Sequence, residues 1–234
     1  MLKKTLQDTW YFFRIHVMPL SAIILPILVP TEIITSLYSY YFTGEDFVLL
    51  EQIPTVIIGF LTYPVYSVGV IFYIASIIDG KVIDTKTAWL LGIKFWGPYL
   101  VLRILMGISI AGGIMLLIIP GVILAVRYSF SEFDLLLSNT NPLEAMKNSW
   151  TLTRKYMLVL LGGYAVIGIS LFLPYYAVLS FFHESNVLLR VLAGMLLIMI
   201  HAVMEVLFTI FAFRVYDDTR VQNDREIRRD VTTV

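Results

Sequence analysis

The chain has 234 residues, of which 59% are hydrophobic and 15% are charged. Soluble domains are usually about 45–50% apolar and about 25% charged, so this composition excludes an ordinary soluble domain. The formal net charge is zero, which gives no reason to expect nucleic acid as a partner. The absence of cysteine excludes disulfides, thiolate nucleophiles and cysteine-ligated metals.

Six apolar stretches approach or exceed the ~20 residues that a helix needs to cross a bilayer. They are expected at residues 17–40, 53–78, 97–119, 121–137, 156–182 and 188–213. The first contains Pro19, Pro26 and Pro30, which membrane helices tolerate as kinks. The sequence therefore predicts an all-α, polytopic membrane helix bundle: a single six-span domain over residues 1–214, followed by a charged tail over residues 215–234.

Basic residues alternate from one connection to the next. Lys or Arg occurs in the N-terminal segment, in the connections after the second and fourth spans, and in the tail. The first loop, residues 43–52, carries only acidic charges. Because basic residues near span ends stay cytoplasmic, both termini are expected in the cytoplasm.

A short amphipathic helix is expected at residues 141–154. Asn141 can cap it, Pro142 suits the first helical position, and Glu144 completes a capping-box pattern. Leu143, Met146 and Trp150 share one face, which is typical of a helix lying in the membrane interface. Similar helices are expected at residues 2–14 and 85–100, so three tryptophans are predicted as interfacial anchors: Trp10, Trp89 and Trp150.

These amphipathic helices each precede an odd-numbered span, which predicts a threefold internal repeat. The units would cover about residues 1–80, 84–138 and 141–214. A shift of 57 residues aligns Ala88 with Ala145 and Tyr99 with Tyr156. The alternative is that any cytoplasmic flank before a span acquires tryptophan and basic residues.

Charged residues inside the spans are the candidates for function, because a charge at the bilayer centre costs about 2.5 kcal/mol or more. Counting ~1.5 Å per helical residue places Arg103 and Glu132 at a similar depth, so we expect them to pair. The same count places Glu32 near the level of Arg127. The candidate buried polar or binding residues are Arg127, Glu132, Arg103, Glu32, Glu205, His201 and Asp134.

Three interpretations of these charges stay open. They can pair to fix helix register, with Asp134 snorkelling toward the membrane surface. They can line a polar cavity for a lipid headgroup, an ion or a small solute. They can be catalytic, but the chain has neither HExxH nor GxSxG. His201 and Glu205, at i and i+4, are predicted as a buried polar pair, and no metal or cofactor is expected.

The segments GIMLLIIPGVILAVRYSF and NPLEAMKNSWTLTRKYMLVL resemble the YciC family of uncharacterised bacterial inner-membrane proteins. They also resemble membrane domains attached to some glycerophosphodiester phosphodiesterases. The shared elements are Ile119-Pro120-Gly121, the motif S-x-x-L-T-R from Ser149 to Arg154, and FAFRVY at residues 211–216. The resemblance covers residues 113–160 and the end of the last span. It implies a six-span protein of a bacterial inner membrane and supplies no catalytic residues.

We therefore expect a non-catalytic multi-pass protein in envelope or lipid homeostasis. It would bind membrane lipids or a membrane partner, with a second copy of the chain as one possible partner. The alternative is a transporter of a small solute, an ion or a lipid with a buried polar cavity. An intramembrane enzyme is the third and least favoured interpretation.

Overall fold

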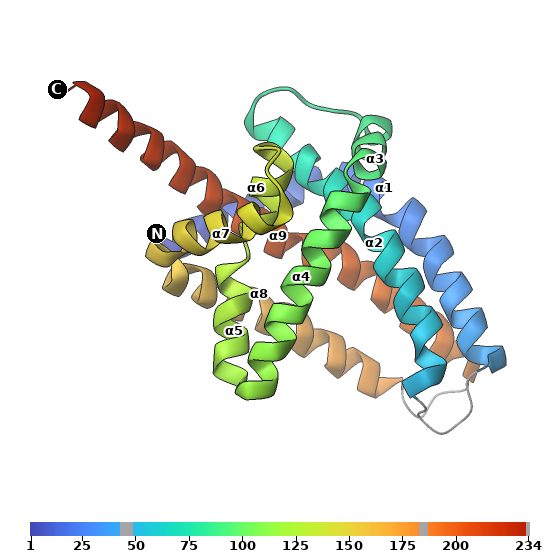
Figure 1. The fold of residues 1–234 in the computed structure, drawn as a ribbon. Coiled ribbons are helices and arrows are strands. Elements are labelled where there is room, and N and C mark those ends of the chain that lie inside the picture. Colours follow the sequence, from blue (N-terminus) through green and yellow to red (C-terminus); the bar gives the residue numbers. More distant parts are fainter. Residues whose placement is uncertain (43–48, 183–186, 233–234) are drawn as a thin grey trace. The chain divides into compact units, whose positions relative to one another are not determined.

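The computed structural model describes residues 1–42, 49–182 and 187–232, and all regular structure in them is helical (Figure 1). Contacts divide the chain into two compact units. Unit 1 comprises Met1–Ile15, Val101–Gly168 and Leu207–Val234, and unit 2 comprises the rest. The elements in chain order are α1 (Leu2–Phe42), α2 (Leu49–Ile78), α3 (Thr85–Lys94), α4 (Trp96–Leu116), α5 (Ile118–Arg127), α6 (Ser131–Leu137), α7 (Pro142–Leu152), the 3-10 turn η1 (Thr153–Lys155), α8 (Met157–Phe181) and α9 (Val187–Thr232).

Five helices among the described residues are long and apolar enough to cross a membrane. The five candidate spans are Leu2–Ser39, Leu50–Ile78, Trp96–Leu116, Met157–Ser180 and Ala193–Arg220. They indicate a membrane protein and confirm the all-α prediction. The threefold repeat, the single six-span domain and the cytoplasmic termini stay predictions.

The predicted fourth span is wrong as a continuous helix. Its residues form the ten-residue α5 and the seven-residue α6, with a break between them at residues 128–130. At ~1.5 Å per residue, α5 is ~15 Å long, about half the thickness of the hydrocarbon core. Neither helix is long enough to span the bilayer by itself.

Glycine lets α5 pack tightly back onto α4, and Figure 1 shows the two helices side by side. A Cβ atom built on Gly113 would lie 3.0 Å from the Cα of Gly121. A Cβ on Gly121 would lie 2.8 Å from the backbone nitrogen of Ile114. Such close approach of two backbones is the usual role of small residues between membrane helices. The chain turns at Leu117, the N-cap of α5, so Pro120 and Gly121 lie in the first turn of that helix and not in the turn itself.

The separate amphipathic helix predicted at residues 2–14 is also wrong, because α1 is continuous from Leu2 to Phe42. The first seventeen residues contain neither proline nor glycine, so nothing local ends the helix. Its buried side chains include Thr5, Thr9 and Phe12, whereas Trp10 is 48% exposed. In the same way, α9 continues without a break through the predicted tail to Thr232.

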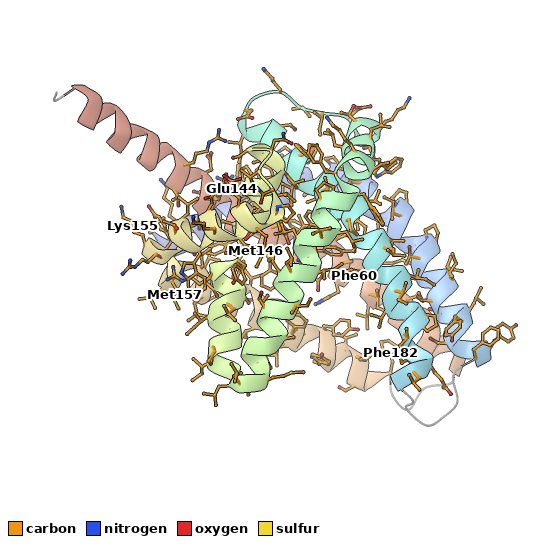
Figure 2. All side chains as sticks on the ribbon, in the orientation of Figure 1. Phe60, Glu144, Met146, Lys155, Met157 and Phe182 are labelled. Carbon is orange, nitrogen blue, oxygen red and sulfur yellow. The ribbon has the colours of Figure 1, made fainter. Side chains whose placement is uncertain are left out.

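The helix predicted at residues 141–154 is confirmed as α7. Asn141 Oδ1 accepts a hydrogen bond from the Glu144 backbone at 2.9 Å, and Asn141 Nδ2 donates to Glu144 Oε2 at 3.1 Å. Met146 is buried, whereas Leu143 is 68% exposed and Trp150 is 41% exposed. That this face lies in the membrane interface stays a prediction. Figure 2 shows Glu144 and Met146 on this helix.

In unit 2, α3 packs against α2 at another glycine. A Cβ atom on Gly92 would lie 2.0 Å from the carbonyl oxygen of Val65, so only glycine fits there. The indole N–H of Trp89, predicted as an interfacial anchor, donates to the carbonyl of Ile23 on α1 at 2.9 Å. Trp89 therefore ties α3 to α1.

Asp84 caps α3 and lies outside the candidate spans. Its Oδ1 accepts from the Thr87 hydroxyl and from the Thr87 backbone N–H, and these two hydrogen bonds hold the pKa of Asp84 below its usual value. A lowered folded-state pKa means that the cap is intact above the ordinary Asp pKa of about 3.9. It is lost as the pH falls through the folded-state value.

We expect backbone amides in the first turn of α3 to exchange faster below about pH 4, after correction for intrinsic rates. Hydrogen exchange on the full chain in detergent measures this. Asp84→Ala should show the fast exchange at every pH. Protection in the wild type that stays at its pH 7 level after Asp84 has become fully protonated would contradict the prediction.

Candidate functional site

Side chains from α7 and η1 hold the break between α5 and α6. The Ser149 hydroxyl donates to the carbonyl oxygen of Arg127 at 2.6 Å and accepts from the backbone N–H of Phe130 at 3.1 Å. The Thr153 hydroxyl donates to the Ser149 carbonyl at 2.7 Å and lies 3.2 Å from the Arg127 carbonyl. Helix ends leave backbone groups without partners, and these buried hydroxyls supply them.

The Arg127 side chain lies against Trp150. One of its terminal nitrogens donates to the Trp150 carbonyl at 2.9 Å, and the guanidinium carbon lies 4.7 Å from the centre of the Trp150 ring. This is cation–π geometry. Glu32, the partner predicted for Arg127, belongs to the other unit, so that pair stays a prediction.

The predicted contact between Arg103 and Glu132 is present. An Arg103 terminal nitrogen lies 2.7 Å from Glu132 Oε1, with side-chain exposures of 36% and 15%. The pair joins α4 to the first turn of α6 within unit 1. The contact is present although the depth of Glu132 was estimated on a continuous helix, whereas Glu132 lies on the separate helix α6.

Asp134 does not snorkel, and that interpretation is wrong. It is only 6% exposed, and its Oδ2 accepts from Asn148 Nδ2 at 2.9 Å and from the Thr140 hydroxyl at 3.1 Å. Two neutral donors therefore stabilise the carboxylate where it is buried. Asp134 joins α6 to α7 and to the loop before it, which is a structural role.

We expect Glu132→Ala to destabilise unit 1 by about 1–2 kcal/mol, because it removes the carboxylate that pairs with Arg103. This figure is below that of a fully buried pair, since Arg103 is 36% exposed. Denaturant unfolding of the full chain in micelles measures the loss. In a double-mutant cycle, Arg103→Ala combined with Glu132→Ala should cost less than the sum of the two single losses. Strict additivity would show that the pair contributes nothing.

His201 and Glu205 are in contact on α9 as predicted, with His201 Nε2 3.3 Å from Glu205 Oε1, but the pair is not buried, because the Glu205 side chain is 49% exposed. The His201 ring also packs against Phe172 and Tyr175 of α8, at centroid distances of 4.9 and 4.8 Å. No group of three possible metal ligands occurs among the described residues. Glu205 belongs to unit 2, whereas Arg103 and Glu132 belong to unit 1.

Unit 2 contains a pocket of about 710 Å³ formed by the end of α1, the start of α2 and α9. Among the described residues that line it, Glu32 is the only ionisable one. Within the described part of unit 2, no hydrogen bond or ion pair joins the Glu32 carboxylate to another side chain. The lining residues are Glu32, Ile33, Thr35, Ser36, Leu37, Ser39, Thr55, Gly194, Met195 and Ile198.

The polar side of this pocket comes mainly from one face of α1. Glu32, Thr35, Ser36 and Ser39 fall at i, i+3, i+4 and i+7, the spacing of a helical stripe. That stripe was a usable signal, but only Glu32 was predicted as a binding residue. In unit 1, the hydroxyls of Ser149 and Thr153 were likewise not predicted, although they lie four residues apart on one helical face.

Comparison with protein-family models, with curated proteins and with solved structures finds no match. The resemblance to the YciC family therefore stays a prediction from the residues that carry it. The structure contains two candidate sites, the charged groups around α6 in unit 1 and the pocket in unit 2. The charged groups of unit 1 are paired with neighbouring protein groups, whereas the pocket of unit 2 is open.

Proposed function

We propose that this chain is a non-catalytic, multi-pass protein of a bacterial inner membrane that binds lipid in the pocket at Glu32. The observation that carries the proposal is the composition of that pocket. A carboxylate and four hydroxyls face the same space as the apolar side chains of Ile33, Leu37, Met195 and Ile198. Ligand sites are typically apolar with a few polar groups that fix orientation.

The charges of unit 1 support a scaffold role. Arg103 forms an ion pair with Glu132, Arg127 donates a hydrogen bond to the Trp150 carbonyl, and Asp134 accepts two hydrogen bonds. These interactions satisfy the groups locally and join α4, α5, α6 and α7. They explain the intramembrane charges without a reaction.

The cellular location rests on the sequence. The alternation of basic residues favours cytoplasmic termini, and the resemblance to the YciC family favours a bacterial inner membrane. In that orientation the first helix runs outward, so Glu32 lies in the outer half of the membrane. The pocket would then receive lipid from the outer leaflet.

The test fills the pocket. Gly194 lines it, and a Cβ atom there would meet no described atom within 4 Å, so Gly194→Leu is chosen to add an apolar side chain to the lining. Gly59→Leu on α2 is the matched control, because Gly59 also has open space around it but does not line the pocket. The full chain is purified in mild detergent, and co-purified lipid is counted per protein by mass spectrometry.

Lipid binding predicts less bound lipid for Gly194→Leu and an unchanged amount for Gly59→Leu. Equal lipid in both variants and the wild type would overturn the proposal. Protein yield and thermal unfolding of both variants are measured in parallel. They separate loss of the ligand from loss of the fold.

A transporter is the second candidate, and α1 gives the observation that favours it. Pro26 and Pro30 lie within two turns before Glu32, and each removes a backbone donor and kinks a helix. A helix that lacks two backbone hydrogen-bond donors beside an open pocket suits movement of the bound group. Fluorescent-lipid flipping in proteoliposomes tests this: wild type should accelerate flipping and Gly194→Leu should not.

A further inference from the structure

We infer that the pocket at Glu32 selects a lipid whose headgroup ends in a primary ammonium group; this rests on the proposed lipid-binding function. Glu32 supplies the opposing charge, the hydroxyls of the α1 stripe supply further acceptors, and the apolar side chains hold the acyl chains. The stripe is defined by Glu32, Thr35, Ser36 and Ser39.

The charge of the residues that line the pocket indicates which lipid headgroup the pocket prefers. Among the described residues that line it, the single ionisable one is an acid, and none is lysine or arginine. A charge within a membrane helix is costly unless it is paired. Within the described part of unit 2 the Glu32 carboxylate has no protein partner, so a cation brought by the ligand would complete the site.

The hydroxyls distinguish a primary ammonium from a quaternary one. The Thr35 hydroxyl donates to the Glu32 carbonyl at 3.2 Å, and the Thr55 hydroxyl donates to the Gln52 carbonyl at 2.7 Å. Their hydrogens are thus used within their own helices, which leaves oxygen lone pairs as acceptors. A primary ammonium has three N–H donors for a carboxylate and hydroxyls, whereas a trimethylammonium has none.

The apolar side chains favour an amphiphile over a free amine. Ile33 and Leu37 on α1 are both well exposed, and Met195 and Ile198 line the pocket from α9. A small soluble amine would leave these surfaces uncovered. A lipid would cover them with its acyl chains, while its phosphate stays hydrated at the open side.

The experiment is a competition on the purified full chain in detergent. Phosphatidylethanolamine, phosphatidylcholine and phosphatidylglycerol with identical acyl chains are offered in equal amounts, and retained lipid is read by native mass spectrometry. Hydrogen bonds to a charged group contribute about 1.5–3 kcal/mol, so wild type should retain phosphatidylethanolamine about tenfold or more over the other two. Equal retention of the three lipids would overturn the inference.

Glu32→Gln should abolish this preference and still retain lipid, because the apolar side chains are unchanged. Glu144→Gln is the control: Glu144 lies on α7 in unit 1 and is not among the described residues that line the pocket, and glutamine also serves in a capping box. It should keep the wild-type preference. Persistence of the preference in Glu32→Gln would overturn the role of Glu32.

Soluble ethanolamine separates a lipid site from a free-amine site. Displacement of bound phosphatidylethanolamine by millimolar ethanolamine would overturn selection of a lipid. If the wild-type chain retains no lipid, the proposed lipid-binding function itself is overturned. If it retains lipid without a headgroup preference, only this inference is overturned. If the Glu32→Gln protein does not accumulate, the relative retention of phosphatidylethanolamine and phosphatidylcholine by the wild type still tests the inference.

Discussion

Gly92→Ala is expected to destabilise unit 2 by about 3 kcal/mol or more, at the upper end of the cost of overpacking. The added methyl would lie 2.0 Å from the carbonyl oxygen of Val65 and 2.9 Å from its carbonyl carbon. Both atoms belong to the backbone of α2, so no side-chain rotation relieves the clash. The helix α3 must move away from α2.

That movement would disturb two further contacts. A Cβ on Gly69 of α2 would lie 3.0 Å from the Ala88 carbonyl, which shows how closely the helices approach. The Trp89 indole on α3 is hydrogen-bonded to Ile23 of α1 at 2.9 Å. We therefore expect a large fall in monodisperse yield and in the thermal midpoint, measured on the detergent-solubilised chain.

Gly59→Ala is the matched control on α2. Nothing lies within 4 Å of a Cβ atom at Gly59, and alanine is the better helix former by about 1 kcal/mol. This variant should be as stable as the wild type or more stable. Equal stability of Gly92→Ala and Gly59→Ala would contradict the packing of α3 on α2.

The second large effect is expected for Ser149→Ala, which should loosen the break between α5 and α6. It leaves the buried N–H of Phe130 without its acceptor and removes one donor to the Arg127 carbonyl. A buried group left unsatisfied costs about 1–3 kcal/mol, so we expect about 2–4 kcal/mol in total. Hydrogen exchange should accelerate in peptides that cover residues 118–137.

Thr151→Ala provides the comparison on the same helix. The Thr151 hydroxyl is exposed and bonds only the Lys147 carbonyl of its own helix at 3.2 Å, so this variant should behave like the wild type. If Ser149→Ala leaves the exchange of residues 118–137 unchanged, the two Ser149 hydrogen bonds do not hold the break.

Signals confined to a few residues gave reliable predictions. The cap of α7 needs only Asn141, Pro142 and Glu144, which are close neighbours in the chain. The Arg103–Glu132 contact followed from comparing depths across one tight turn. Both depend on short separations, so a single sequence is sufficient to predict them.

Features determined by distant residues were missed. The break at residues 128–130 contains neither proline nor glycine, and the side chains that hold it, Ser149 and Thr153, lie about twenty residues downstream. Periodicity alone therefore extends the helix through the break. At the N-terminus the prediction ended a helix too early. The amphipathic pattern at residues 2–14 indicated a separate helix, but no residue there ends it.

The candidate binding site combines residues that the sequence indicates with residues that it does not. Glu32 was identified because it is a charge inside an apolar span, and the polar stripe of α1 was visible in the sequence. The other side of the pocket comes from Thr55 on α2 and from Gly194 and Met195 on α9. These segments are far apart in the chain, and only the folded unit brings them to the same space.

The composition of unit 1 has a consequence for biosynthesis. Phe12 near the N-terminus lies against Arg214 of α9, with the guanidinium carbon 5.4 Å from the ring centre, and Leu2 lies close to Gly162 of α8. Ribosomes add about 5–20 residues per second, so Phe12 is made roughly 10–40 s before Arg214. During that interval the nascent N-terminal segment lacks its final contacts. Unit 1 therefore closes only after translation has reached the last helix, and a prematurely terminated chain leaves it incomplete.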